Sequence, residues 1–203
     1  MFALNQDFGR LLNDKIRSVG ASNVPSWPSF NPTANIKTRE TWYAERITRA
    51  FGEALDKLGH TASLVSLTSE SLQQRAYLFP GELKKGDINF YIGSRDDGLN
   101  GFVVGLFRSH NDTNGSRLID NQNQVHQDPM LNSLRKLAHF CRQSKTSYGF
   151  IYTNDELIAC RFRQRVYIRP IPLNGHGSMS PQQAMWYLCM LAFYDRHGLA
   201  RSA

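Results

Sequence analysis

The segment SPQQAMWYLCMLAFY, residues 180–194, restricts the fold more than any other part of the chain. Ser180 and Gln183 have the spacing of a capping box and Pro181 stands at the first helical position, so the pattern predicts a helix that begins here. The residues that follow are apolar around almost the whole circumference of such a helix. A helix of this kind needs cover on all sides, so we expect it in the core of the protein or in an interface between two copies of the chain.

Upstream of this segment, patterns typical of helices and of strands alternate. Apolar residues at helical spacing predict helices, and short apolar runs between turn residues predict strands. We expect helices over residues 2–18, 39–59 and 131–141, and strands over residues 62–67, 75–79, 87–92, 102–108, 148–152, 157–162 and 166–171. This order predicts an α/β or α+β fold in which helices flank a central mixed sheet. Residues 1–37 are expected to form an N-terminal helix and an irregular connector, and residues 38–203 one domain that includes the buried final helix.

Composition and charge narrow the class of protein further. Of the 203 residues 41% are hydrophobic, which is enough for one sizeable core. The net charge of +7 favours polyanionic partners. Three cysteines without C-x-x-C spacing indicate neither a disulfide framework nor a zinc site, and they favour an intracellular compartment, cytoplasmic or nuclear. No segment reaches the roughly 20 apolar residues of a membrane span, and the N-terminus lacks the pattern of a secretory signal.

Two neighbouring strand-like runs have the layout of a metal-dependent nuclease core. The first, KKGDINFYIG, contains Asp87, and the second, NGFVVGLFRSH, covers residues 100–110. In such a core the second strand carries a carboxylate and a lysine, which help to hold Mg²⁺ or Mn²⁺ and to stabilise the charge that develops during phosphodiester hydrolysis. Residues 100–109 contain no carboxylate and a single cation, Arg108.

Three stretches carry a resemblance to a known family. They are TWYAERITRAF in the first long helix, LRKLAHFCRQSKTSYGFIYTNDELIACRF in the helix–strand block, and PIPLNGHGSMSPQQAMWYLCMLA near the C-terminal end. Over roughly residues 38–195 the chain resembles the PD-(D/E)xK nuclease superfamily, and in particular nuclease-like proteins common in filamentous fungi. The resemblance implies a restriction-endonuclease-like core with a central mixed sheet flanked by helices.

Carried over residue by residue, the resemblance implies that the catalytic motif is degenerate. Glu45 matches the acid of the first helix, and Asp87 matches the motif aspartate. Gly105 stands at the position of the strand acid and Phe107 at that of the lysine, while Lys136 occupies a helix position where related proteins carry Gln. We expect Asp87 and Glu45 to face one cleft beside Gly105, and we expect neither metal-dependent catalysis nor a cofactor.

Several of these residues have a second interpretation. Asp87 could be a ligand for Mg²⁺ or Mn²⁺, or a residue that starts a strand after a Gly-Asp turn. Glu45 could be a second acid near a metal, or a solvated helix carboxylate. His110, Asp112 and His126 lie near one another in the sequence but match no compact metal-site motif, so loop residues are favoured.

The stretch CRFRQRVYIRP carries the most regular basic pattern. On a continuous strand alternate residues share a face at intervals of about 6–7 Å, which is comparable to the spacing of phosphates along a nucleic-acid strand. The arginines of this parity are Arg161, Arg163, Arg165 and Arg169, and the preceding helix adds Arg135, Lys136, Arg142 and Lys145. The alternative is a solubilising outer face or a charged edge strand, and the strand could break near Gln164.

These observations lead to one hypothesis and two rivals. The hypothesis is a catalytically degenerate nuclease-fold protein that acts by binding nucleic acid or a protein partner, without a membrane. The first rival is an active metal-dependent nuclease with relocated ligands, which alone would require Mg²⁺ or Mn²⁺. The second is a fungal effector or genetic-conflict protein that uses the fold as an interaction scaffold. A homodimer through the final helix is compatible with each of them.

Overall fold

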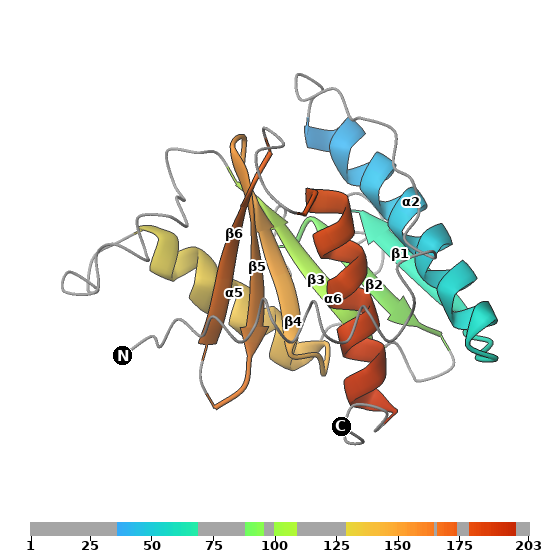
Figure 1. The fold of residues 1–203 in the computed structure, drawn as a ribbon. Helices are drawn as coiled ribbons and strands as arrows, with labels where there is room; N and C mark the ends of the chain where they lie inside the picture. The colour runs from blue at the N-terminus through green and yellow to red at the C-terminus, as the bar shows by residue number, and fades with distance from the viewer. Residues whose placement is uncertain are drawn as a thin grey trace.

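The computed structural model describes residues 36–68, 88–95, 100–108, 129–164, 166–173 and 179–197. Within these ranges three helices surround a six-stranded mixed sheet (Figure 1). In chain order the elements are α2 (Ile36–Lys57), β1 (Leu64–Thr68), β2 (Phe90–Ser94), β3 (Gly101–Phe107), α5 (Pro129–Gln143), β4 (Tyr148–Tyr152), β5 (Glu156–Phe162), β6 (Val166–Pro172) and α6 (Pro181–Arg196). The predicted class, a mixed sheet flanked by helices, is confirmed.

The strands lie in the sheet in the same order as in the chain, and they form two antiparallel meanders. β1, β2 and β3 make the first meander, and β4, β5 and β6 make the second. β3 and β4 connect the meanders and run parallel. Parallel neighbours need a crossover connection, and α5 lies in that connection between β3 and β4.

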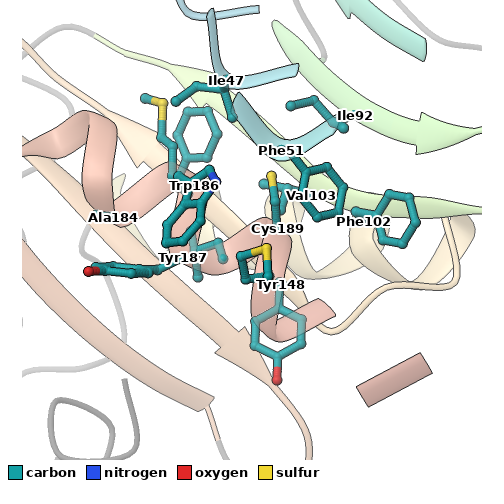
Figure 2. Close-up of a cluster of buried hydrophobic side chains, with 14 of the residues drawn as sticks. Ile47, Phe51, Ile92, Phe102, Val103, Tyr148, Ala184, Trp186, Tyr187 and Cys189 are labelled. Carbon is teal, nitrogen blue, oxygen red and sulfur yellow. The ribbon is translucent and has the colours of Figure 1, made fainter. Parts of the chain in front are cut away.

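Each face of the sheet has its own hydrophobic core. α2 and α6 cover one face, where Figure 2 shows Phe51 and Trp186 together with Ile92 and Val103 of the sheet. α5 covers the other face, and its apolar side packs in a second cluster that includes Val104 of β3. Successive side chains of a strand point to opposite faces, which explains why neighbouring residues of β3 belong to different clusters.

The final helix, α6, confirms the prediction from its capping box and its apolar circumference. The hydroxyl of Ser180 accepts the backbone N–H of Gln183 at 3.2 Å, and the side chain of Gln183 accepts the backbone N–H of Ser180 at 2.8 Å. Trp186 is buried, and its indole N–H donates to the carbonyl of Ala50 on α2 at 3.3 Å. α6 thus obtains its cover within a single chain.

Within the described residues, the strand predictions agree with the structure except at some boundaries. β4 spans Tyr148–Tyr152 as predicted, whereas β2 begins at Phe90 rather than at residue 87. Just before β2, the side-chain oxygen of Asn89 accepts the backbone N–H of Phe107 at 2.8 Å. At this end of β3 the side chain of Asn89 therefore supplies a hydrogen bond that the predicted longer strand would have supplied through its backbone.

α2 also departs from its predicted bounds at the N-terminal end. It begins at Ile36 rather than at residue 39, so it crosses the boundary expected at residue 37. Once a helix has nucleated, each further turn adds hydrogen bonds at little extra cost, so such boundaries extend readily. At its other end, Gly59 has φ of 74°, and the backbone N–H of His60 donates to the carbonyl of Leu55 at 2.9 Å. This is the usual glycine-terminated helix end, and it agrees with the predicted stop at Gly59.

Some predictions fall outside the described residues. They concern the helix over residues 2–18, the connector, the strand over residues 75–79, and the segment that contains His110, Asp112 and His126. Among the described helices, none combines the length and the apolar character that a membrane span requires.

Candidate nucleic-acid interface

The catalytic position implied by the resemblance lies where β2 and β3 run side by side. Gly105 of β3 is paired with Phe90, the first residue of β2. The two strands are therefore antiparallel neighbours. Asp87 falls outside the described residues, so its place beside Gly105 stays a prediction.

An aromatic ring fills the space next to Gly105. A Cβ atom built on Gly105 would lie 2.6 and 2.8 Å from two ring carbons of Phe150 on β4, and closer still to a third. Carbon atoms in favourable contact are separated by about 3.5–4.0 Å. Phe150 is fully buried in the core between the sheet and its covering helices. A carboxylate side chain therefore has no room at this position.

Phe107, at the position of the expected lysine, belongs to the same aromatic cluster. The centroid of its ring lies 5.3 Å from that of Tyr152, with an interplanar angle of 30°. The hydroxyl of Tyr152 in turn lies 3.0 Å from that of Tyr43 on α2. Offset ring pairs of this kind stabilise a core beyond the area that they bury. Phe107 thus belongs to the aromatic packing between the sheet and α2.

The two remaining residues of the constellation lie elsewhere. Glu45 is exposed on α2 whereas Tyr43 is buried, because side chains two residues apart on a helix do not face the same way. Glu45 is thus open to solvent, and the expectation that it shares a cleft with Asp87 beside Gly105 stays a prediction. Lys136 is half-buried on α5, and α5 packs on the opposite face of the sheet from Phe107.

The described residues do not fit Mg²⁺ or Mn²⁺ at this position. Both ions take oxygen ligands such as carboxylates, and the space next to Gly105 holds the ring of Phe150. Throughout the described ranges, no group of three His, Cys, Asp or Glu side chains is arranged to hold a metal ion. No metal-dependent step is therefore assigned to these residues.

The arginines near the C-terminal end of β5 do not share a continuous strand. β5 ends at Phe162 and β6 begins at Val166, so the chain reverses at the point where a break near Gln164 was considered. In this hairpin Arg169 lies opposite Ala159, two residues before Arg161. Arg161 and Arg169 therefore lie on one face of the sheet, the face covered by α6, while Arg165 is outside the described residues.

Arg161 and Arg163 converge on a carboxylate in the last turn of α6. Both guanidinium groups form ion pairs with Oδ2 of Asp195, at 3.4 Å in the case of Arg161. The hydroxyl of Tyr148 donates to the same oxygen. Burial alone would raise the pKa of Asp195, but the hydrogen bonds from Tyr148 and Arg163 and the two guanidinium charges hold that pKa below its usual value. These two arginines are thus engaged within the molecule.

α5 presents an outer side that carries only basic charge. Arg135, His139 and Arg142 are exposed, and their spacing of four and three residues places them in one row along the helix. Lys136 lies half-buried next to this row, and the sequence of α5 contains no acidic residue. Gathered like charges repel one another and favour contact with a polyanion. The row adds His139 to the predicted Arg135 and Arg142, and it is the strongest candidate for contact with nucleic acid among the described residues.

The turn after α5 adds an exposed lysine in an unusual backbone conformation. Lys145 has φ of 52° and is exposed. Its neighbour Thr146 donates its backbone N–H to the carbonyl of Cys141 at 2.9 Å, so Lys145 occupies the place that glycine usually takes at a helix end. A side chain in this left-handed region costs roughly 1–2 kcal/mol relative to the right-handed region. Because strained backbone conformations are often retained at functional sites, the presence of lysine here indicates that its charge has a function.

Sequence reasoning missed the partners of the hairpin arginines. Tyr148 and Asp195 come from β4 and α6, and they are 47 residues apart in the chain. Asp195 itself is one local signal. The helix dipole disfavours an acid in the last turn of a helix, so Asp195 at the end of α6 predicts a cation nearby. Arg196 was also missed: its guanidinium donates to the carbonyl of Gly101 at 2.6 Å and ties α6 to the start of β3.

No known protein family, no curated protein and no solved structure matches this chain.

Proposed function

We propose that this protein is a catalytically degenerate, nuclease-like protein that acts by binding nucleic acid. The order of helix, three strands, helix and strand supports a nuclease-like core, and so does the pairing of β2 with β3. The rings of Phe150 and Phe107 at the positions of the expected carboxylate and lysine support the loss of metal-dependent chemistry. Removal of one such electrostatic group costs about 10²–10³ in rate, and here two are replaced together.

The observation that carries the proposal is the uniformly basic outer side of α5. Arg135 and Arg142 are seven residues apart, which corresponds to about 10 Å along a helix axis. Two exposed guanidinium groups at this distance can reach different phosphates of one duplex strand. Arginine suits this role because its planar group stays charged and donates several hydrogen bonds to phosphate oxygens.

The proposed interface continues at the C-terminal end of α5. Lys145 follows directly after the helix and is exposed. Two residues further on, the carbonyl of Ser147 accepts the backbone N–H of Phe162 at 2.7 Å, which fixes this turn against the C-terminal end of β5. Contacts from such side chains to phosphate position the protein without reading bases. Binding is therefore expected to tolerate changes in nucleotide sequence.

The test measures binding of the full chain to a labelled duplex and to a labelled single strand by fluorescence anisotropy at several salt concentrations. We expect binding at low salt that weakens steeply as salt increases, because bound phosphates release counterions. We expect no cleavage of either probe with Mg²⁺ or Mn²⁺. Absence of binding at low salt would contradict the proposal and favour a protein partner. Metal-dependent cleavage would instead favour the active nuclease with relocated ligands.

A further inference from the structure

The carboxylate of Asp195 lies in a cage of several donors, one of which it leaves without a partner. Three donors converge on its Oδ2 atom alone: the hydroxyl of Tyr148, Nη2 of Arg161 and Nη2 of Arg163. The Nε atom of Arg161 is buried in the same place and has no hydrogen-bond partner. A buried donor without a partner is costly, so the cage is not optimised for a carboxylate.

The chemistry of the cage suits a tetrahedral oxyanion better than a planar carboxylate. A phosphate group offers more acceptor oxygens than Asp195, arranged tetrahedrally, and arginine can donate to it through two nitrogens at once. The cage is also open to solvent on one side, since 49% of the Arg163 side chain and 22% of the Asp195 side chain are exposed. The side chain of Arg161 is only 13% exposed, which supplies a fixed inner wall.

From this geometry we propose that Tyr148, Arg161 and Arg163 form a binding site for a phosphate group, and that Asp195 is its built-in competitor. The site deepens the proposed function, because a nucleic-acid phosphate is one source of the ligand and free phosphate is the other. In the parent protein the carboxylate blocks the cage and makes phosphate binding weak. Loss of the carboxylate charge opens it.

The first experiment titrates inorganic phosphate into the parent and the Asp195→Asn variant at constant ionic strength and follows the thermal unfolding temperature. Asparagine keeps the size of the side chain and removes its charge. We expect an apparent affinity for phosphate that is about tenfold or more higher in the variant, because each charge-assisted hydrogen bond contributes strongly to binding. The matched control is Asp56→Asn on α2, which removes the same charge from an exposed position. It should behave as the parent does.

Two further variants test whether a gain in phosphate affinity depends on the donors of the cage and on the loss of the Asp195 charge. Adding Arg163→Gln to Asp195→Asn should abolish the gain, since one donor of the cage is lost. Asp195→Ser serves as a second neutral variant if Asp195→Asn does not fold. If neither neutral variant folds, or if phosphate affects Asp195→Asn and Asp56→Asn equally, Asp195 is a purely structural residue and the inference is wrong.

A short duplex in place of inorganic phosphate separates this inference from the proposed function. If Asp195→Asn gains affinity for phosphate but neither it nor the parent binds duplex, the cage serves free phosphate and the nucleic-acid proposal fails. If the parent binds duplex and Asp195→Asn gains nothing with either probe, the proposed function stands and the cage does not exist.

Discussion

The two helices that cover opposite faces of the sheet, α2 and α5, differ most on their outer sides. Exposed acids and bases alternate along α2 at intervals of four residues, and they are Glu45, Arg49, Glu53 and Lys57. Opposite charges at this spacing stabilise a helix by about 0.2–0.5 kcal/mol per pair. The row on α5, formed by Arg135, His139 and Arg142, has no such partner within its own helix. The charged side chains of α2 can therefore stabilise α2 itself, whereas those of α5 are suited to binding an external polyanion.

The inner sides differ as well. Beneath α2 and α6, the rings of Phe107, Phe150 and Tyr152 fill the place that the resemblance assigns to catalysis. Beneath α5, the cluster that contains Leu137 and Val104 includes neither of the two degenerate strand positions. One face of the sheet therefore carries a closely packed aromatic core, and the helix on the other face carries a basic surface. Chemistry and binding are separable properties of such a fold.

The largest effect is expected at Gly105, where the ring of Phe150 fills the adjacent space. Gly105→Ala places a Cβ atom against the ring of Phe150, and overpacking of this kind should lower the free energy of unfolding by about 3 kcal/mol. Gly105→Glu adds a buried charge and should prevent folding. Urea-induced unfolding provides the measurement.

The matched control for this prediction is the same substitution in the middle of α2. A Cβ atom on Gly52 would lie 3.7 Å from Cδ1 of Leu64, an ordinary contact. Gly52→Ala should therefore raise the free energy of unfolding by about 0.5–1 kcal/mol, since alanine is the better helix former. Equal stability of Gly105→Ala and the parent would show that the position next to Gly105 is not filled, and the comparison of the two faces would fail.

A smaller effect, dependent on pH, is expected at Asp195. Its pKa is below the usual value in the folded protein, so the ionised carboxylate contributes stability above the pKa of the unfolded chain, about 3.9. That contribution is lost as the pH falls through the folded pKa. The difference in stability between the parent and Asp195→Asn should therefore be largest near neutral pH and shrink below about pH 4. Thermal unfolding from pH 7 to pH 2.5 measures it, and a difference that stays constant over this range would show that the charge of Asp195 does not stabilise the fold.

The smallest effect is expected at the turn after α5. Lys145→Gly relieves the left-handed backbone conformation and should raise the free energy of unfolding by about 1 kcal/mol. The same change removes a proposed phosphate contact, so affinity for duplex should fall while stability rises. Chemical unfolding and anisotropy on the same samples measure both quantities. If affinity is unchanged, Lys145 does not belong to the interface.

The sequence predicts features that depend on interactions between residues close together in the chain, and it does not predict those that depend on residues far apart. The final helix and β4 were predicted closely because capping residues and apolar periodicity are local signals. The hairpin between β5 and β6 is harder to predict, because the sequence between Phe162 and Val166 is Arg-Gln-Arg, and none of these residues favours a turn. The basic row on α5 follows from helical periodicity. The cage around Asp195 depends on contacts between three separate elements, and no local pattern specifies them.

The most direct test of the central claim compares two pairs of arginines for their effect on duplex binding. One variant combines Arg135→Gln with Arg142→Gln on α5, and the other combines Arg46→Gln with Arg49→Gln on α2, so the net charge changes equally. We expect the α5 variant to lower the slope of log K against log salt by about 1.8, since each phosphate contact contributes about 0.9 for duplex DNA. The α2 variant should keep the slope of the parent. Equal changes in slope for the two variants, or no change in either, would contradict the assignment of α5 as the nucleic-acid interface.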